Sequence, residues 1–203
     1  MSVGPNNRSI QSIQNILHGI HEMHPCFFQR QLWEQYIDKY GMQLCQSTNY
    51  HCGHFTGSSI IVSSKYDCVL LIYHPAFQKW IQPGGHLELH ETIQETILRE
   101  IYEETKTTRE FLQPLMVQDD FLTYLHRFDV PKNTSKQRPE HQHFDICLFY
   151  EYTGNIKNDH FSNLSCSTTS NMQKKWFPTS DIRTIPTDDA TKDLLYFLHS
   201  YLE

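Results

Sequence analysis

The spacing of apolar residues predicts two helices at the start of the chain. Over residues 8–24 they recur at three- and four-residue intervals, at Ile10, Ile13, Leu17, Ile20 and Met23. Pro25 ends this pattern, and a second helical pattern follows over residues 27–40, with Gly41 placed to cap it. We therefore expect a helical extension over residues 1–48 and a separate domain over residues 49–203.

Beyond residue 49 the pattern changes to short runs of β-branched and aromatic residues. The runs at 55–63 and 68–73 flank Lys65-Tyr66-Asp67 and predict a β-hairpin. We expect further strands at residues 79–81, 121–128, 143–152 and 174–177. The polar segments 131–140 and 154–171 are expected to be loops.

Helical spacing returns in two later segments. Ile93, Ile97 and Ile101 form an apolar stripe within a helix expected over Glu91–Thr105. A leucine-rich helix should close the chain, with Thr187 as its N-cap. Strands mixed with helices, without a regular strand–helix alternation, indicate an α/β or α+β sandwich.

Charge and composition exclude some classes of protein. The 17 basic and 23 acidic side chains give a net charge of -6, which argues against general nucleic-acid binding. The 12 Phe, 11 Tyr and 3 Trp residues favour a packed core over disorder. No stretch approaches the ~18–20 apolar residues of a membrane span, and no secretory signal is visible. We therefore expect a soluble cytoplasmic protein whose six cysteines are reduced.

Three glutamates share one side of the helix expected over Glu91–Thr105. Glu100, Glu103 and Glu104 stand three or four residues apart, where like charges destabilise a helix by a few tenths of a kcal/mol per pair. The nearby helix C-terminus also disfavours anions. Divalent cations would reverse both penalties. For the three glutamates alone, a solvated acidic face is the simpler interpretation.

The surrounding residues add a long, gapped pattern. Gly85 is followed by five residues and Glu91, then by seven residues and the run 99–104, which reads Arg-Glu-Ile-Tyr-Glu-Glu. This segment resembles the Nudix box, G-x5-E-x7-R-E-U-x-E-E-x-G-U with U aliphatic, at seven of its nine defined positions. The preceding residues 80–85, Trp-Ile-Gln-Pro-Gly-Gly, also look like the approach to that motif.

Two positions depart from the box. Lys106 stands in place of the glycine, and Thr107 in place of an aliphatic residue. That glycine normally ends the helix in a left-handed conformation. A lysine there costs about 1 kcal/mol, or else the helix ends differently.

The resemblance implies a fold, a reaction and a set of site residues. The implied fold is a Nudix-type α/β/α sandwich with a mixed β-sheet. The implied reaction is hydrolysis of a diphosphate linkage in a nucleoside diphosphate derivative, with Mg²⁺ or Mn²⁺ as cofactor. The implied metal ligands are the Gly85 carbonyl, Glu100, Glu103 and Glu104, and Glu100 also orients or deprotonates water. Arg99 and Glu91 would orient these carboxylates.

Several further residues are candidates for substrate contacts or catalysis. Trp80 would stack a base, although a tryptophan before a glycine turn equally belongs to a core. His86 would contact a phosphate. Glu140 would act as general base, against the simpler interpretation of a solvated loop carboxylate.

The 13 histidines include a group near the expected strand ends, comprising His51, His54, His126, His141 and His143. A His-x-His pair on a strand places both rings on one face. Together with His54, this pair would form a transition-metal site. Hydrogen-bonded rim residues or phosphate contacts are the simpler interpretation, because the spacing matches no recognised closed zinc site.

Two other functions stay open. The altered Lys106-Thr107 favours a regulatory or nucleotide-binding module without turnover. An isomerase of allylic diphosphates would need a catalytic cysteine, for which Cys52 is the candidate. Substrate choice should reside in residues 1–50 and 129–142, and a homodimer is an open possibility for the N-terminal helices.

Overall fold

The computed structural model describes residues 8–88, 90–117, 119–135, 137–156 and 173–202. Its α-helices are α1 (Arg8–His18), α2 (Phe27–Tyr40), α3 (Ile93–Thr105) and α5 (Asp189–Leu202). Short 3₁₀ helices lie at Gly41–Cys45, Arg109–Phe111 and Thr179–Asp181. The strands are β1 (His54–Ser63), β2 (Cys68–His74), β3 (Lys79–Ile81), β4 (Gly84–His86), β5 (Leu112–Pro114), β6 (Met116–Val117), β7 (Asp120–Phe121), β8 (Thr123–Val130), β9 (His141–Tyr152) and β10 (Gln173–Pro178).

A mixed β-sheet forms the centre of the molecule, with the strand order β10-β2-β1-β9-β5. The long central strands β1 and β9 run parallel, from His54 opposite His143 to Ser63 opposite Tyr152. The N-terminal half of β1 also pairs with β4, and its C-terminal half pairs with β2. β8 continues the sheet along β9.

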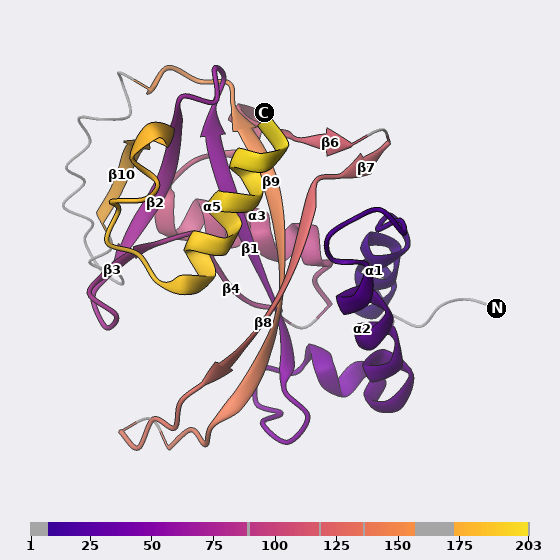
Figure 1. Cartoon of the computed structure of the whole chain (residues 1–203). Helices are drawn as coiled ribbons and strands as arrows, with labels where there is room; N and C mark the ends of the chain where they lie inside the picture. The colour runs from indigo at the N-terminus through magenta and orange to yellow at the C-terminus, as the bar shows by residue number, and fades with distance from the viewer. Residues whose placement is uncertain (1–7, 89, 118, 136, 157–172, 203) are drawn as a thin grey trace.

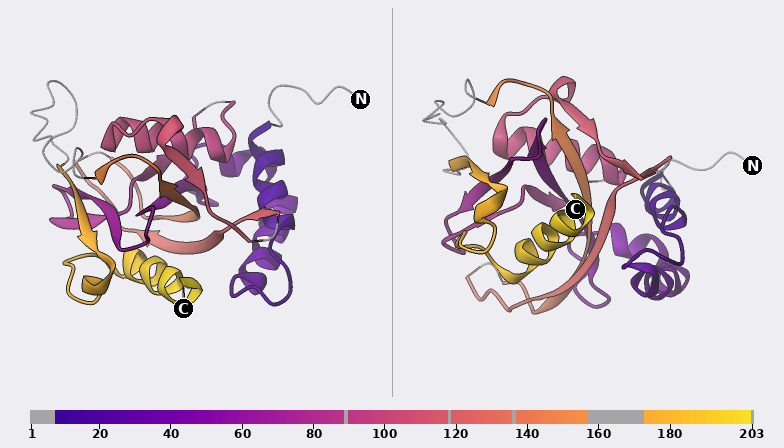
Figure 2. Two further views of the ribbon diagram at one scale, coloured as in Figure 1. Left: turned by 90° about the horizontal axis from the view of Figure 1, so that it is seen from above. Right: turned by 45° about the horizontal axis from the view of Figure 1, so that its top comes forward.

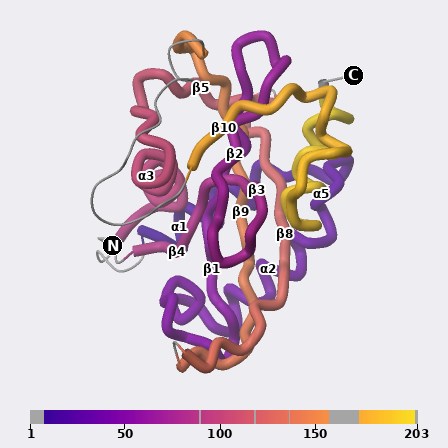
Figure 3. The backbone as a smooth tube through the Cα atoms, turned by 90° about the vertical axis from the view of Figure 1, so that its left-hand side faces the viewer, coloured from indigo at the N-terminus to yellow at the C-terminus, as the bar shows by residue number. Residues whose placement is uncertain are grey.

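Helices cover both faces of this sheet. α3 lies on one side and α5 on the other, while α1 and α2 stand together at one end (Figures 1–3). Alternate residues of the strands feed two core clusters. Ile61 and Ile146 belong to the cluster under α3, whereas Ile60, Val62 and Phe149 pack under α5. The observed α/β/α arrangement confirms the predicted fold class.

The N-terminal helices pack directly on this core. Trp33 of α2 is buried, with ring centroids 5.6 Å from Phe55 and 5.7 Å from Phe144. At the N-terminus of α3, the backbone N–H of Ile93 donates to Ser12 Oγ at 3.0 Å. Ser9 Oγ donates to the Glu91 carbonyl at 2.5 Å. α1 therefore supplies part of the cap of α3.

Several predicted elements are confirmed. The hairpin of β1 and β2 forms, β3 covers residues 79–81, and Gly41 caps α2 by donating its N–H to the Ile37 carbonyl. α3 begins after Thr92, which forms a capping box with Glu95.

Other predicted details are wrong. Met23 is 96% exposed because α1 already ends at His18. The strand expected over 121–128 is divided, since Phe121 belongs to β7 in a small sheet with β6. Asp188 takes the capping role expected of Thr187, because Asp188 Oδ1 accepts the Thr191 N–H at 2.8 Å. Most of the loop expected over 154–171 lies outside the described residues.

Candidate active site

The predicted glutamates Glu100, Glu103 and Glu104 lie where α3 faces β4. Together with Gly85, Glu91 and Arg99 they are called the acidic cluster below. The backbone N–H of Gly84 donates to Glu104 Oε2 at 3.0 Å. Glu100 packs so closely on Gly85 that a Cβ at Gly85 would overlap its carboxylate. Any larger residue at this point of β4 would force the Glu100 carboxylate to move.

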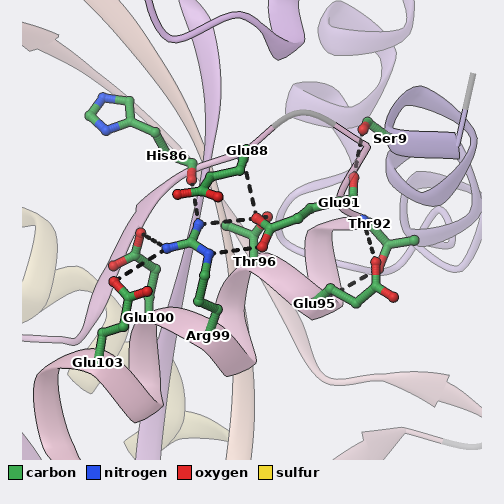
Figure 4. Close-up of polar contacts among 10 residues, drawn as sticks. All are labelled: Ser9, His86, Glu88, Glu91, Thr92, Glu95, Thr96, Arg99, Glu100 and Glu103. Atoms are coloured by element: carbon green, nitrogen blue, oxygen red, sulfur yellow. Dashed lines mark hydrogen bonds and ion pairs between the residues drawn. The ribbon is translucent and has the colours of Figure 1, made fainter. Parts of the chain in front are cut away.

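Arg99 ties the acidic residues together (Figure 4). Its Nε and Nη2 donate to both carboxylate oxygens of Glu91, at 2.8 and 3.0 Å. Its Nη1 donates to Glu100 Oε1 at 2.8 Å and lies 3.5 Å from Glu103 Oε2. Nη2 also donates to the His86 carbonyl at 2.9 Å. This two-pronged pairing fixes the planes of the carboxylates, as expected for a guanidinium.

The carboxyl groups of the acidic cluster differ in the direction in which their pKa values are shifted. Burial alone would raise the pKa of Glu91, but the hydrogen bonds from Arg99 and Thr96 lower it below its usual value. Burial raises the pKa of Glu104 to about 8, opposed by the Gly84 N–H and reinforced by Glu100 and Glu103. Burial also raises the pKa of Glu100. Carboxylate oxygens gathered and desolvated in this way fit a hard divalent cation.

A second group of side chains, called the imidazole cluster below, comes from three strands and lies on the side of β4 away from Arg99. His54 of β1, His86 of β4 and His143 of β9 each offer a ring nitrogen within 4.8 Å of the other two. The sheet register explains this grouping. His54 of β1 stands opposite His143 of β9, and Thr56, two residues further along β1 and on the same face, stands opposite His86 of β4. Figure 4 shows the His86 ring pointing away from Arg99, while its carbonyl points toward it.

His54 is buried and His86 and His143 are half-buried, which disfavours a positive charge on their rings. Burial, reinforced by neighbouring imidazoles and Arg138, lowers the pKa of His54 to about 4 and that of His143 to about 3. Burial also lowers the pKa of His86. At neutral pH these three rings are therefore uncharged.

Asp145 is a candidate site residue that the sequence analysis missed. Its Oδ1 accepts from Thr56 Oγ1 at 2.7 Å, and its Oδ2 accepts from Ser58 Oγ at 2.5 Å. Burial raises the pKa of this carboxyl group. Alternation along β9 would have revealed it, since His141, His143 and Asp145 share one strand face.

One cavity of about 1000 Å³ brings the two clusters together. Its lining includes Gly85 and Glu104 from the acidic cluster, His86 and His143 from the imidazole cluster, and Asp145. Tyr36, His51, Cys52 and Glu140 line a separate cavity of about 560 Å³, and His141 borders both.

The remaining candidates lie apart from the acidic cluster. Trp80 packs against Tyr73 and Phe177, with centroid distances of 5.4 and 5.1 Å, whereas its neighbours on β3, Lys79 and Ile81, line the larger cavity. Since adjacent strand residues point to opposite faces, Trp80 is directed into the core. Glu140 borders the smaller cavity, so the structure does not bring it to the acidic cluster. His126 lines the larger cavity and lies 3.8 Å from Asp193 Oδ2.

The cysteines follow a simpler pattern. Cys26, Cys45, Cys52, Cys68 and Cys147 are free thiols, and Cys166 lies outside the described residues. Burial raises the pKa of Cys52, which keeps its thiol protonated, and the residue does not line the larger cavity. This arrangement offers no support for Cys52 as the catalytic thiol of an isomerase.

Lys106 takes the conformation of the glycine that it replaces. It ends α3 at φ 58° and ψ 18°, and its N–H donates to the Tyr102 carbonyl. Its Nζ donates to the Glu103 carbonyl at 2.9 Å. The departure from the box therefore leaves the helix end in the usual left-handed form.

Among the described residues, no helix combines the length and apolar character needed to cross a bilayer.

Solved structures share the fold at low sequence identity. A NUDIX-family hydrolase from Clostridium perfringens is 23% identical with a TM-score of 0.50, and the match covers 74% of this chain and 98% of that one. A binary complex of the C. elegans Ap4A hydrolase is 17% identical with a TM-score of 0.51, covering 73% and 96%.

A curated relative and a family model add to this likeness. The probable DHNTP pyrophosphohydrolase of Lactococcus lactis subsp. cremoris (strain MG1363) is 31% identical over 115 residues, which is 54% of this chain. The match spans 65% of that relative's length. The model of the NUDIX domain matches residues 54–199, from the first residue of β1 into α5. This match, which extends over most of the chain and contains the Arg99-centred acidic cluster, shows that the chain belongs to the NUDIX domain family.

Proposed function

We propose that the protein is a divalent-metal-dependent hydrolase that cleaves the diphosphate linkage of a nucleoside diphosphate derivative. The observation that carries this proposal is the acidic cluster, in which Arg99 holds Glu91 and Glu100 while Glu104 is anchored on β4. The name of the Lactococcus relative, a probable DHNTP pyrophosphohydrolase, supports the same class of reaction. Membership of the NUDIX domain family supports it further.

In this proposal Glu100, Glu103, Glu104 and the Gly85 carbonyl hold Mg²⁺ or Mn²⁺. A cation held there would supply positive charge against the phosphate oxygens and a lowered pKa for a bound water. Arg99 and Glu91 act as positioning residues, because Glu91 holds the guanidinium of Arg99, which donates to Glu100 Oε1.

The proton-accepting role is assigned to Glu100. Glu140 borders the smaller cavity, whereas Glu100 lies within the acidic cluster against Gly85. His86 and His143 line the larger cavity and are proposed to face the substrate. Trp80 is not included among the substrate contacts, because it packs against Tyr73 and Phe177.

The decisive experiment measures hydrolysis of a panel of nucleoside diphosphate derivatives with Mg²⁺ or Mn²⁺. The double variant Glu103→Gln/Glu104→Gln should lose more than about 100-fold in kcat/KM, since outer-shell partners alone are worth 10–100-fold. Glu110→Gln is the matched control, because Glu110 is an exposed carboxylate outside α3. Equal rates in the double variant and the wild type would overturn the metal-site assignment. Binding without turnover across the panel would instead favour a regulatory module.

We also propose a cytoplasmic location and self-association into a homodimer. The free thiols of the described cysteines fit a reducing compartment. On α2, Phe28 is 79% exposed and Leu32, one turn later, is 38% exposed, which supports contact with a second copy of the chain. Light scattering of the wild type and of Phe28→Ser/Leu32→Ser tests this: a monomer in the wild type would exclude the dimer.

A further inference from the structure

We propose that His54, His86 and His143 form a second cation site, distinct from the acidic cluster, that binds a first-row transition metal such as Zn²⁺. Ring nitrogens from these three residues lie within 4.8 Å of one another, and each residue comes from a different strand. Imidazole nitrogen is a ligand that Zn²⁺ favours, whereas Mg²⁺ prefers oxygen. The site therefore differs in chemistry from the glutamates of α3.

The strongest observation is the state of His54. Its side chain is fully buried, and its Nδ1 lies 3.3 Å from the Asn49 carbonyl, to which it donates. Its Nε2 therefore carries a lone pair, and this buried atom has no hydrogen-bond partner among the described residues. An unsatisfied buried nitrogen is costly unless something binds it. A metal ion at the centre of the cluster would do so.

A neighbouring histidine strengthens the geometry. His141 Nδ1 lies 2.8 Å from the Pro139 carbonyl, to which it donates. His141 Nε2 stands 3.1 Å from His143 Nε2, which places His141 against one ligand of the site. Metal-binding histidines typically donate their other ring N–H to a carbonyl, as His54 does here. We assign His141 a positioning role and leave the ligand set at three.

The site is open on one side. His86 and His143 line the cavity of about 1000 Å³ that also reaches Glu104. His54 is fully buried and is not among the residues that line this cavity. Three protein ligands with an open fourth position are typical of zinc sites that exchange a ligand with solvent or substrate. Arg138 also lines this cavity, so a bound phosphate is the rival occupant.

Metal binding is tested on the full chain after chelator dialysis, by calorimetric titration with Zn²⁺ in excess Mg²⁺. The wild type should bind one zinc ion per chain. His86→Ala and His143→Ala should each weaken binding by more than the roughly 10–100-fold typical of losing an outer-shell partner. His126→Ala is the matched control, because His126 lines the same cavity outside the cluster. X-ray absorption of the zinc-loaded protein should show nitrogen ligands of the imidazole type.

The outcomes separate this site from the proposed hydrolase site. Glu103→Gln/Glu104→Gln should keep its zinc, whether or not the protein hydrolyses any substrate. Circular dichroism of the metal-free histidine variants checks that each one is folded. Failure of the wild type to bind zinc, or equal zinc affinity in folded His86→Ala and His143→Ala, would overturn the proposal. Binding of inorganic phosphate in place of zinc, lost in the same variants, would also overturn it.

Discussion

The acidic cluster and the imidazole cluster lie on opposite sides of β4 and are held in different ways. In the acidic cluster a single cation, Arg99, organises the carboxylates through charged hydrogen bonds. In the imidazole cluster, burial keeps the rings neutral, and the backbone carbonyl of Asn49 orients the ring of His54. A site built on charge pairing depends on one side chain, whereas a site built on strand register depends on the whole sheet.

The acidic cluster should break most sharply at Gly85. In Gly85→Ala the new Cβ would displace Glu100, and a displacement of about 1 Å can cost roughly 100-fold in rate. Steady-state kinetics of diphosphate hydrolysis measure this loss. Gly41→Ala is the control for a glycine outside the site: a Cβ there meets nothing within 4 Å, and its φ of 53° should cost stability but leave kcat/KM of the folded protein unchanged. Unchanged kcat/KM in Gly85→Ala would contradict the close packing of Glu100.

Arg99→Lys tests whether charge alone holds the acidic cluster. Lysine keeps the positive charge but cannot reproduce the paired contact with Glu91, so kcat should fall about 10–100-fold. As a positioning residue, Arg99 should also set the Mg²⁺ concentration needed for half-maximal activity, which should rise. Arg30→Lys, at the ion pair with Glu34 on α2, should change neither quantity. Wild-type kinetics in Arg99→Lys would show that charge is sufficient.

Ser12→Ala tests whether α1 stabilises the protein by capping the N-terminus of α3. The change removes the acceptor of the Ile93 N–H and should lower the free energy of unfolding by about 1 kcal/mol, as for other lost caps. Denaturant unfolding measures the effect. Ser200→Ala, whose exposed hydroxyl bonds within α5, should change stability by less than about 0.5 kcal/mol. Equal stability of Ser12→Ala and the wild type would refute the capping role of α1.

The smallest effect is expected at the end of α3. Lys106→Gly should stabilise the fold by about 0.5–1 kcal/mol, because glycine adopts the left-handed conformation without strain. For a chain of this size, 1 kcal/mol raises Tm by about 2–4 °C. Gln35→Gly, on the exposed face of α2, should instead destabilise by about 1 kcal/mol. A fall in Tm for Lys106→Gly would mean that the bond from Lys106 Nζ to the Glu103 carbonyl outweighs the backbone strain.

The same difference explains what could be predicted from the sequence. The glutamates of α3 lie one turn apart, so helical periodicity was enough to group them. β4 escaped prediction because two of its three residues are glycines, which carry no strand signal. The trio of His54, His86 and His143 depends on the parallel pairing of β1 with β9, and strands so distant in the chain have no local pattern that fixes their register. Thr187 was misplaced as a cap by one residue, within the usual uncertainty of helix ends.

The ten-residue ladder between β1 and β9 also determines which parts of the chain tolerate an inserted residue. Inserting one residue between His141 and Asp145 would turn the following side chains to the opposite face and exchange polar groups for core residues. Among the described residues of 131–140, the pairing is reduced to an isolated bridge between Asn133 and Arg138, and lengthening a surface loop adds little free-energy cost. The loop residues Pro131, Lys132, Asn133 and Arg138 form part of the wall of the larger cavity. Insertions at the tip of the β8–β9 hairpin would therefore reshape this wall while the strands below keep their register.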